Sequence, residues 1–131
     1  MTDIELVKQA FKAMEKAYAP YSNFKVGAAL LTQEGELYSG CNIENASYGA
    51  TNCAERTAIF KAVSEGAGKI HKIAIVSSSG EYTPPCGICR QVMMEFFEKD
   101  GYIILSDRDF HLKKISIADI FPYPFDENDL K

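Results

Sequence analysis

The sequence lacks a long hydrophobic segment and a basic, hydrophobic leader at its N-terminus. No apolar run reaches the roughly 18 residues that a membrane-spanning helix requires. The first residues also lack the basic stretch and apolar region of a secretory signal peptide. These absences argue against a membrane protein and against an exported one, so we expect a cytoplasmic protein with no membrane partner.

Blocks of lysine and arginine are also missing. The chain has 14 basic and 18 acidic residues, for a formal net charge of −4, whereas proteins that act on nucleic-acid polymers usually carry a basic patch for the phosphates. No segment is repetitive or of low complexity, and 47% of the residues are hydrophobic, which is enough for one core. We expect a single domain over residues 1–131 with a small, weakly charged substrate and no nucleic-acid polymer as partner.

Cysteine is scarce, with four residues in the chain. Without an export signal, these favour metal binding or catalysis over disulfides. Three of them form a split cluster, Cys53-Ala54-Glu55 followed by Pro85-Cys86-Gly87-Ile88-Cys89. Three thiolates can hold one Zn²⁺ and leave its fourth position open, as catalytic zinc sites do. Glu55 can then stand beside the metal without ligating it, which predicts a hydrolytic site with Glu55 as the proton carrier.

Hydrophobic periodicity predicts alternating helices and strands, the first helix starting at a capping box formed by Thr2 and Glu5. Such alternation implies a three-layer α/β/α sandwich, an α/β fold with a mixed sheet of about five strands. The predicted helices cover residues 3–17, 53–66, 87–99 and 116–120, and the predicted strands cover residues 25–32, 37–43, 70–77, 102–105 and 112–115.

In this arrangement Cys53 begins the second helix and Cys86 begins the third. The positive end of a helix dipole lowers the pKa of a thiol, and only the thiolate binds metal. Three thiolates exceed the charge of Zn²⁺ by one unit, so the site needs a compensating cation. Arg56 is the expected one, because its guanidinium can donate to sulfur. Arg90 is a second candidate, although a surface salt bridge is the role expected for it.

The remaining cysteine and both histidines are expected to lie outside the metal site. Cys41 falls within a predicted strand and is read as a buried free cysteine. His71 and His111 lie at strand edges in charged surroundings, and three better zinc ligands exist.

Four segments of the chain together resemble the cytidine deaminases of the short, homotetrameric type. The Cys-x-Glu … Pro-Cys-x-x-Cys arrangement is similar to the zinc signature of nucleobase and nucleoside deaminases. Its first ligand is cysteine, as in the free-cytidine type. The resemblance runs from about residue 6 to residue 130, and its strongest segments are residues 19–30, 40–48, 53–58 and 85–91.

This resemblance implies a cytidine deaminase-like fold and hydrolytic deamination of cytidine and deoxycytidine to uridine and deoxyuridine, a step of pyrimidine salvage that breaks a cyclic amidine C–N bond. Zinc-bound water attacks C4, and Glu55 is the catalytic proton shuttle. The implied zinc ligands are Cys53, Cys86 and Cys89. The implied substrate contacts are Phe24 at the pyrimidine, the Ala54 backbone at the base, Asn42 and Glu44 at the ribose hydroxyls, and Tyr48 and Phe125, which reach a neighbouring subunit's site in a homotetramer.

Three other functions are compatible with parts of the sequence. Another aminopyrimidine nucleoside, such as blasticidin S, is an alternative substrate, although Asn42 and Glu44 favour a plain ribose. A zinc-stabilised binding module without turnover would need a closed four-ligand site, whereas the motif supplies three ligands. A redox protein could use Cys86 and Cys89 as a dithiol, but Cys53 and Glu55 would then have no role.

Overall fold

A five-stranded sheet forms the centre of the protein in a computed structural model that describes residues 1–130. Helices and short 3-10 turns surround it. The helices are α1 (Asp3–Met14), α2 (Ala54–Ser64), α3 (Gly87–Phe96) and α4 (Ile117–Ile120), and the 3-10 turns are η1 (Tyr48–Ala50) and η2 (Glu127–Leu130). The strands are β1 (Val26–Thr32), β2 (Leu37–Cys41), β3 (Ile70–Ser77), β4 (Phe97–Ser106) and β5 (Leu112–Ser116).

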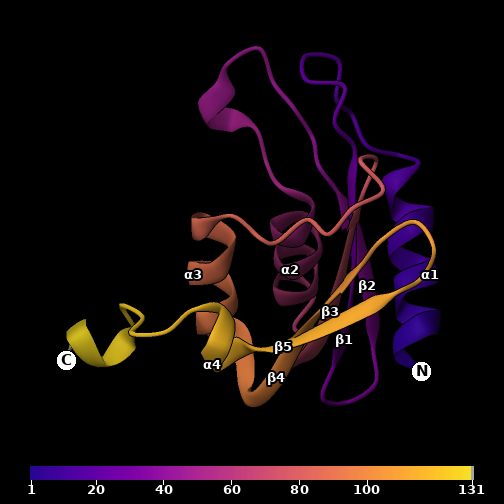
Figure 1. Ribbon diagram of the computed structural model, residues 1–131. Coiled ribbons are helices and arrows are strands. Elements are labelled where there is room, and N and C mark those ends of the chain that lie inside the picture. The colour runs from indigo at the N-terminus through magenta and orange to yellow at the C-terminus, as the bar shows by residue number, and fades with distance from the viewer. Residues whose placement is uncertain (131) are drawn as a thin grey trace.

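The strand order is β2-β1-β3-β4-β5. Strands β3 and β4 are parallel, and every other neighbouring pair is antiparallel. A parallel pair needs a crossover connection, and α3 supplies it. Helix α1 lies on one face of the sheet, and α2 and α3 lie on the other (Figure 1). The predicted three-layer sandwich with a mixed sheet of five strands is therefore confirmed.

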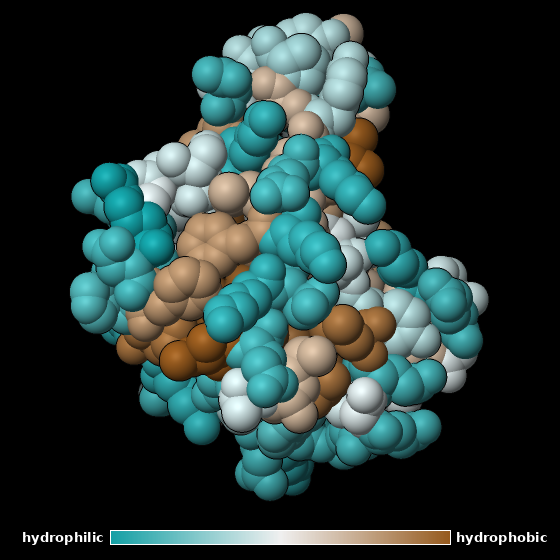
Figure 2. Space-filling view, turned by 90° about the vertical axis from the view of Figure 1, so that its right-hand side faces the viewer, coloured by the Kyte–Doolittle hydropathy of each residue, from teal (hydrophilic) through white to brown (hydrophobic). Residues whose placement is uncertain are grey.

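Alternation along the strands divides the core between the two faces, because successive strand side chains point in opposite directions. In β1, Ala28 and Leu30 join the cluster that includes α2 and α3, whereas Ala29 joins the cluster of α1. Helix α1 approaches β1 closely, since a Cβ on Gly27 would lie 2.1 Å from the Ala10 carbonyl oxygen. The outer surface on the α1 side is mostly hydrophilic (Figure 2).

Several element ends differ from the sequence prediction; β4, for example, begins at Phe97 instead of residue 102, and α2 ends at Ser64 instead of residue 66. Helix α1 ends at Met14 instead of residue 17, and β2 ends at Cys41 instead of residue 43. Helix α3 ends at Phe96 instead of residue 99, because Phe97 pairs with Ile70 of β3 and begins β4. Phe97 is buried in β4, so an apolar residue that fits the hydrophobic face of a helix is instead part of the sheet. Within residues 1–130, no helix has the length and apolar character needed to cross a membrane.

Candidate metal centre and active site

The three predicted ligands come from the N-terminal ends of two neighbouring helices. Cys53 is the N-cap residue of α2, and Cys86 is the N-cap residue of α3. Cys89 lies in the first turn of α3 and is buried. Since α2 and α3 pack together on one face of the sheet, their N-terminal ends bring the three sulfur atoms within 4.8 Å of one another.

The spacing of the sulfurs fits a zinc ion. Zinc–thiolate bonds of about 2.3 Å in tetrahedral geometry place sulfur atoms about 3.8 Å apart, and the Sγ atoms of Cys53 and Cys86 are 3.8 Å apart. Among residues 1–130, this cluster is the one group of three or more candidate ligands, and it offers three. Three ligands leave one zinc coordination position open, which argues against a binding module with a closed four-ligand site. The place of Cys53 in the same cluster argues against a redox protein that uses Cys86 and Cys89 alone.

Charges around the cluster favour the thiolate form of Cys53. The pKa of this thiol is lowered to about 5, because Cys89 donates a hydrogen bond to it and because Arg56 does so as well. The Arg56 Nη2 atom lies 3.2 Å from the Cys53 Sγ atom. The pKa of Cys89 is raised by the proton it shares with Cys53 and by burial. A divalent cation would take the place of that shared proton.

Glu55 is buried at the start of α2, two residues beyond Cys53. Only 4% of it is exposed, and burial raises its pKa to about 7, with the negative charge of Cys53 acting in the same direction. A carboxyl group with a pKa near neutrality accepts and releases protons at working pH. Glu55 is not one of the three clustered candidate ligands, so it is available for proton transfer.

Asn42 is buried and bound to the chain that leads into β1. Its Oδ1 atom accepts a hydrogen bond of 2.8 Å from the Val26 N–H, and its Nδ2 atom donates one of 2.8 Å to the Phe24 carbonyl. A side-chain amide can form four hydrogen bonds, so the Asn42 amide can accept one more hydrogen bond and donate one more. Phe24 itself is 39% exposed, and Asn42 thus holds in place the backbone that presents this ring.

Glu44 is held by the turn that precedes β1. Its Oε1 atom accepts hydrogen bonds from the Tyr21 N–H at 2.9 Å and the Ser22 N–H at 3.1 Å. The Ser22 hydroxyl donates to its Oε2 atom. The hydrogen bond from the Ser22 hydroxyl is the main cause that lowers the pKa of Glu44. The side chain is therefore an ionised carboxylate. Glu44 and Tyr48 share a pocket of about 330 Å³ with Tyr21, Ser22 and Thr51.

Two of the predicted contact residues point into solvent. Tyr48, in η1, is 78% exposed, and Phe125, between α4 and η2, is 58% exposed. The Phe125 carbonyl accepts a hydrogen bond of 2.6 Å from Gln91 Nε2 of α3. Ala54 is fully buried at the first position of α2, between Cys53 and Glu55.

Arg90 and Cys41 differ from their predicted environments. In the described chain, Arg90 donates to the Pro85 and Ile120 carbonyls, so the predicted surface salt bridge is wrong. Cys41 is a free cysteine, but it is half-buried at the end of β2 and not buried within the strand. Burial still raises the pKa of its thiol.

Both histidines lie outside the cluster, as expected. His71 pairs with Glu98, and His111 pairs with Asp107. Sequence reasoning gave no role to Ser22 or Gln91, which bind Glu44 and the Phe125 carbonyl. Both residues lie inside the segments that carry the family resemblance, and this was the signal that could have identified them.

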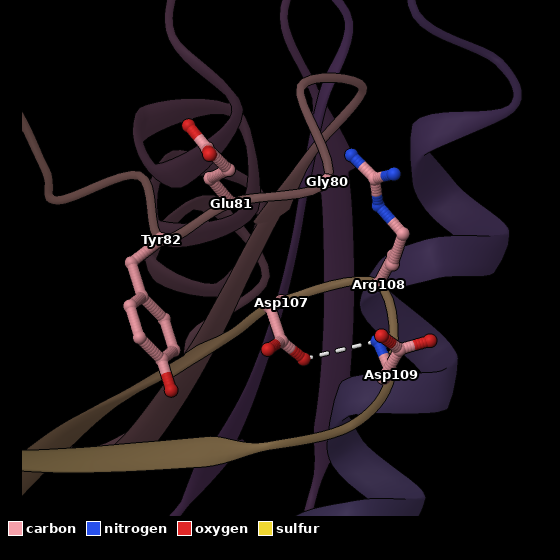
Figure 3. A pocket seen from close by; sticks show the side chains of 6 residues that line it. All are labelled: Gly80, Glu81, Tyr82, Asp107, Arg108 and Asp109. Carbon is pink, nitrogen blue, oxygen red and sulfur yellow. Dashed lines mark hydrogen bonds between the residues drawn. The ribbon is translucent and has the colours of Figure 1, made fainter.

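A pocket of about 640 Å³ lies at the C-terminal ends of β3 and β4, lined by residues 80–82 and 107–109 (Figure 3). Its polar groups shape the two turns that enclose it. The Asp107 carboxylate accepts a hydrogen bond from the Asp109 N–H, and Arg108 donates to the Ser79 carbonyl. None of the predicted site residues line this pocket, so the cysteine cluster remains the candidate active centre.

Comparisons with known proteins agree with this centre. Residues 1–105 match the family model described as the cytidine and deoxycytidylate deaminase zinc-binding region. A cytidine deaminase of Halalkalibacterium halodurans is 48% identical over 95% of both chains. The crystal structure of a cytidine deaminase from Burkholderia pseudomallei has 46% identity and a TM-score of 0.90, covering 95% of this chain and 100% of the other.

A cytidine deaminase from Mycobacterium tuberculosis has 36% identity and a TM-score of 0.83, over 96% of this chain and 99% of that structure. The family model names zinc, the metal that the thiolate spacing fits. With the fold, the three clustered sulfurs and these matches in agreement, the chain belongs to the cytidine and deoxycytidylate deaminase family.

Proposed function

We propose that this protein catalyses the zinc-dependent hydrolysis of cytidine and deoxycytidine to uridine and deoxyuridine. The observation that carries the proposal is a buried carboxyl group, Glu55, placed beside three clustered thiols at two helix N-termini. Relatives named as cytidine deaminases at 45–48% identity support the choice of substrate. The reaction suits pyrimidine salvage in the cytoplasm, carried out by one domain that spans the chain.

Cys53, Cys86 and Cys89 would hold the zinc ion, which supplies Lewis acidity that makes water a stronger acid and nucleophile. Glu55 accepts a proton from the attacking water and passes it to the ring nitrogen. A C–O bond forms at C4 in this first step. Glu55 then takes the proton of the new C4 hydroxyl and delivers it to the amine, so that the C4–N bond breaks as the C4 carbonyl forms. One water is consumed and one ammonia is released for each nucleoside, so a single buried carboxyl group serves several proton transfers.

Substrate recognition would use the side chains that surround the start of β1. Asn42 and the ionised Glu44 suit the ribose hydroxyls, because an amide and a carboxylate can accept hydrogen bonds from them. The exposed ring of Phe24 would lie against the pyrimidine. The Ala54 backbone, between Cys53 and Glu55, would contact the base.

The active unit would be a homotetramer whose sites are shared between subunits. Tyr48 and Phe125 are large aromatic side chains that stand exposed, and exposed aromatic side chains near a functional site favour an interaction surface. Docked against a neighbouring subunit, they would close its nucleoside pocket and exclude water. Symmetric contacts of this kind build closed oligomers.

A metal count combined with a spectroscopic assay tests the proposal. The purified protein should contain about one zinc per chain and should change the ultraviolet absorbance of cytidine, with ammonia and uridine formed in equal amounts. Blasticidin S serves as the comparison substrate and should be turned over more slowly. A zinc-free protein with full activity, or a zinc-loaded one inert toward both substrates, would refute the assignment.

A further inference from the structure

We propose that Arg90 and Gln91 are positioning residues that fasten the C-terminal tail, residues 121–130, to the structure that carries Cys86 and Cys89. Both follow directly after Cys89 in α3, and each donates a hydrogen bond to a carbonyl at one end of the segment 120–125. The consequence for substrate affinity rests on the proposed function of Phe125. The anchorage itself depends only on these contacts.

Arg90 joins two segments that are far apart in the sequence. Its Nε atom donates a hydrogen bond of 2.7 Å to the Pro85 carbonyl, immediately before Cys86. Its Nη1 atom donates one of 2.9 Å to the carbonyl of Ile120, the last residue of α4. Pro85 and Ile120 are both buried. One planar guanidinium can satisfy both carbonyls in a fixed geometry, which the point charge of a lysine does not reproduce.

Gln91 holds the far end of the same segment. Its Nε2 atom donates a hydrogen bond of 2.6 Å to the Phe125 carbonyl. The segment between the two anchors has little freedom, because Pro122 and Pro124 fix their own φ angles. Tyr123 between them has a φ of 52°, in the left-handed region that non-glycine residues rarely adopt, so the flanking structure imposes the shape of the segment.

Side-chain packing holds the start of the tail, where Phe121 packs against the core, but contributes little around Tyr123 and Phe125. Tyr123 is fully exposed and Phe125 is 58% exposed. A hollow of about 460 Å³ separates part of the tail from α3, with Gln91, Asp126 and Asn128 in its lining. The tail projects beside α3 and is not covered by other elements (Figure 1). The Gln91 hydrogen bond therefore fixes the backbone at Phe125, and the Arg90 hydrogen bond fixes the end of α4 from which the tail departs.

The anchors also couple the tail to metal binding. Arg90 and Gln91 stand one and two residues after Cys89, and Arg90 bonds the residue before Cys86, so any movement of this turn moves the tail. Coupling between two sites is reciprocal. Removing zinc should therefore release the tail, and removing the Arg90 anchor should speed the loss of zinc.

The test uses the full-length, zinc-loaded protein and measures three quantities. These are the rate of chymotrypsin cleavage after Phe125, the rate of zinc transfer to a chelator, and the separate kcat and KM for cytidine. Gln91→Glu preserves shape but sets a carboxylate against the Phe125 carbonyl. It should raise the cleavage rate and KM by about tenfold, as expected for one lost hydrogen bond, with kcat and zinc content unchanged.

Arg90→Leu should accelerate both cleavage and zinc transfer, and Arg90→Lys should restore them only in part. Arg108→Leu is the matched control, because Arg108 also donates to a backbone carbonyl, that of Ser79, in a turn outside the tail. Cleavage in Gln91→Glu or Arg90→Leu, or zinc transfer in Arg90→Leu, that is no faster than in Arg108→Leu would overturn the proposal. If Arg90→Leu does not fold, the Gln91→Glu result decides alone. Accelerated cleavage in a protein that never converts cytidine would overturn the proposed function and support the anchorage.

Discussion

The guanidinium of Arg56 donates a hydrogen bond to the sulfur of Cys53, over 3.2 Å and within one turn at the start of α2. This contact places a permanent positive charge against a cluster of thiols whose combined charge, once ionised, exceeds that of Zn²⁺ by one unit. It also helps to lower the pKa of Cys53 to about 5, together with the hydrogen bond from Cys89.

Arg56→Ala should therefore keep zinc but work more slowly at neutral pH. Without the guanidinium, the excess negative charge of the site makes the activated water less acidic. The pH–rate profile should therefore move to higher pH by about one unit, a usual effect of one neighbouring charge. Arg108→Ala is the control. A profile that stays in place while only the unfolding temperature falls would show that Arg56 has a structural role alone.

Glu55→Gln should abolish most of the activity and leave the metal in place. Removing a general acid–base group costs ~10²–10⁴ in rate, and we expect the upper end or beyond because one group serves several proton transfers. Zinc content and binding of a pyrimidine nucleoside, followed by calorimetry, should match those of the parent. Glu65→Gln, at the other end of α2, is the control, and activity within tenfold of the parent in Glu55→Gln would assign the shuttle to another residue.

Cys53→Ala should lose zinc and stability together. The metal ties the starts of α2 and α3, and a ligand bound only by the folded state stabilises it by about 4 kcal/mol at a thousand times its Kd. Metal analysis and thermal unfolding with and without a chelator measure both effects. Cys41→Ala is the control, since its thiol stands apart from the cluster, and equal zinc content in the two variants would contradict the assigned ligand set.

Asp3, at the start of α1 and away from the thiol cluster, should make the free energy of unfolding depend on pH. Burial opposes ionisation of Asp3, but hydrogen bonds from Lys72 and Tyr102 outweigh it and lower its pKa. Because the folded pKa lies below the unfolded one, this stabilisation is complete above about pH 4 and disappears as the pH falls through the lowered value. Asp3→Asn should cost about 1–3 kcal/mol at pH 7, since the largely buried Lys72 ammonium loses its opposite charge and is left with neutral acceptors.

Denaturant unfolding at pH 7 and near pH 2.5 checks this prediction. The difference between Asp3→Asn and the parent should shrink at the lower pH, because the stabilisation is lost as Asp3 takes up a proton. Asp100→Asn, at an exposed position, should change little at either pH. A loss of stability in Asp3→Asn that is the same at both values would show that ionisation of Asp3 is not its source.

Deleting residues 125–131 should raise the substrate concentration needed for half-maximal rate and leave the zinc content unchanged. The deletion removes Phe125, the aromatic side chain proposed to close a neighbouring subunit's pocket, but none of the clustered thiols. Sedimentation of the parent protein should show a tetramer. A fully active monomer at assay concentration would refute shared sites without affecting the proposed reaction.

Local patterns in the sequence were enough to predict the fold class, the family and the thiol cluster. The strand predicted over residues 25–32 is β1 in the structure, where alternation puts Ala28 and Ala29 on opposite faces of the sheet. The helices predicted over residues 53–66 and 87–99 placed Cys53 and Cys86 at helix starts, where the structure has them as N-caps. These features depend on residues close in the chain, so period and spacing express them directly.

Contacts between distant segments were decided only by the tertiary structure. Phe97 became a strand residue because Ile70 of β3 was there to pair with it. Arg90 bound carbonyls at Pro85 and Ile120 and formed no surface salt bridge within the described chain. Asn42, in turn, is committed to the backbone at Phe24 and Val26. Each outcome required two segments to meet in space, and the partner that a buried donor or acceptor finds depends on the packed fold and not on its sequence neighbours.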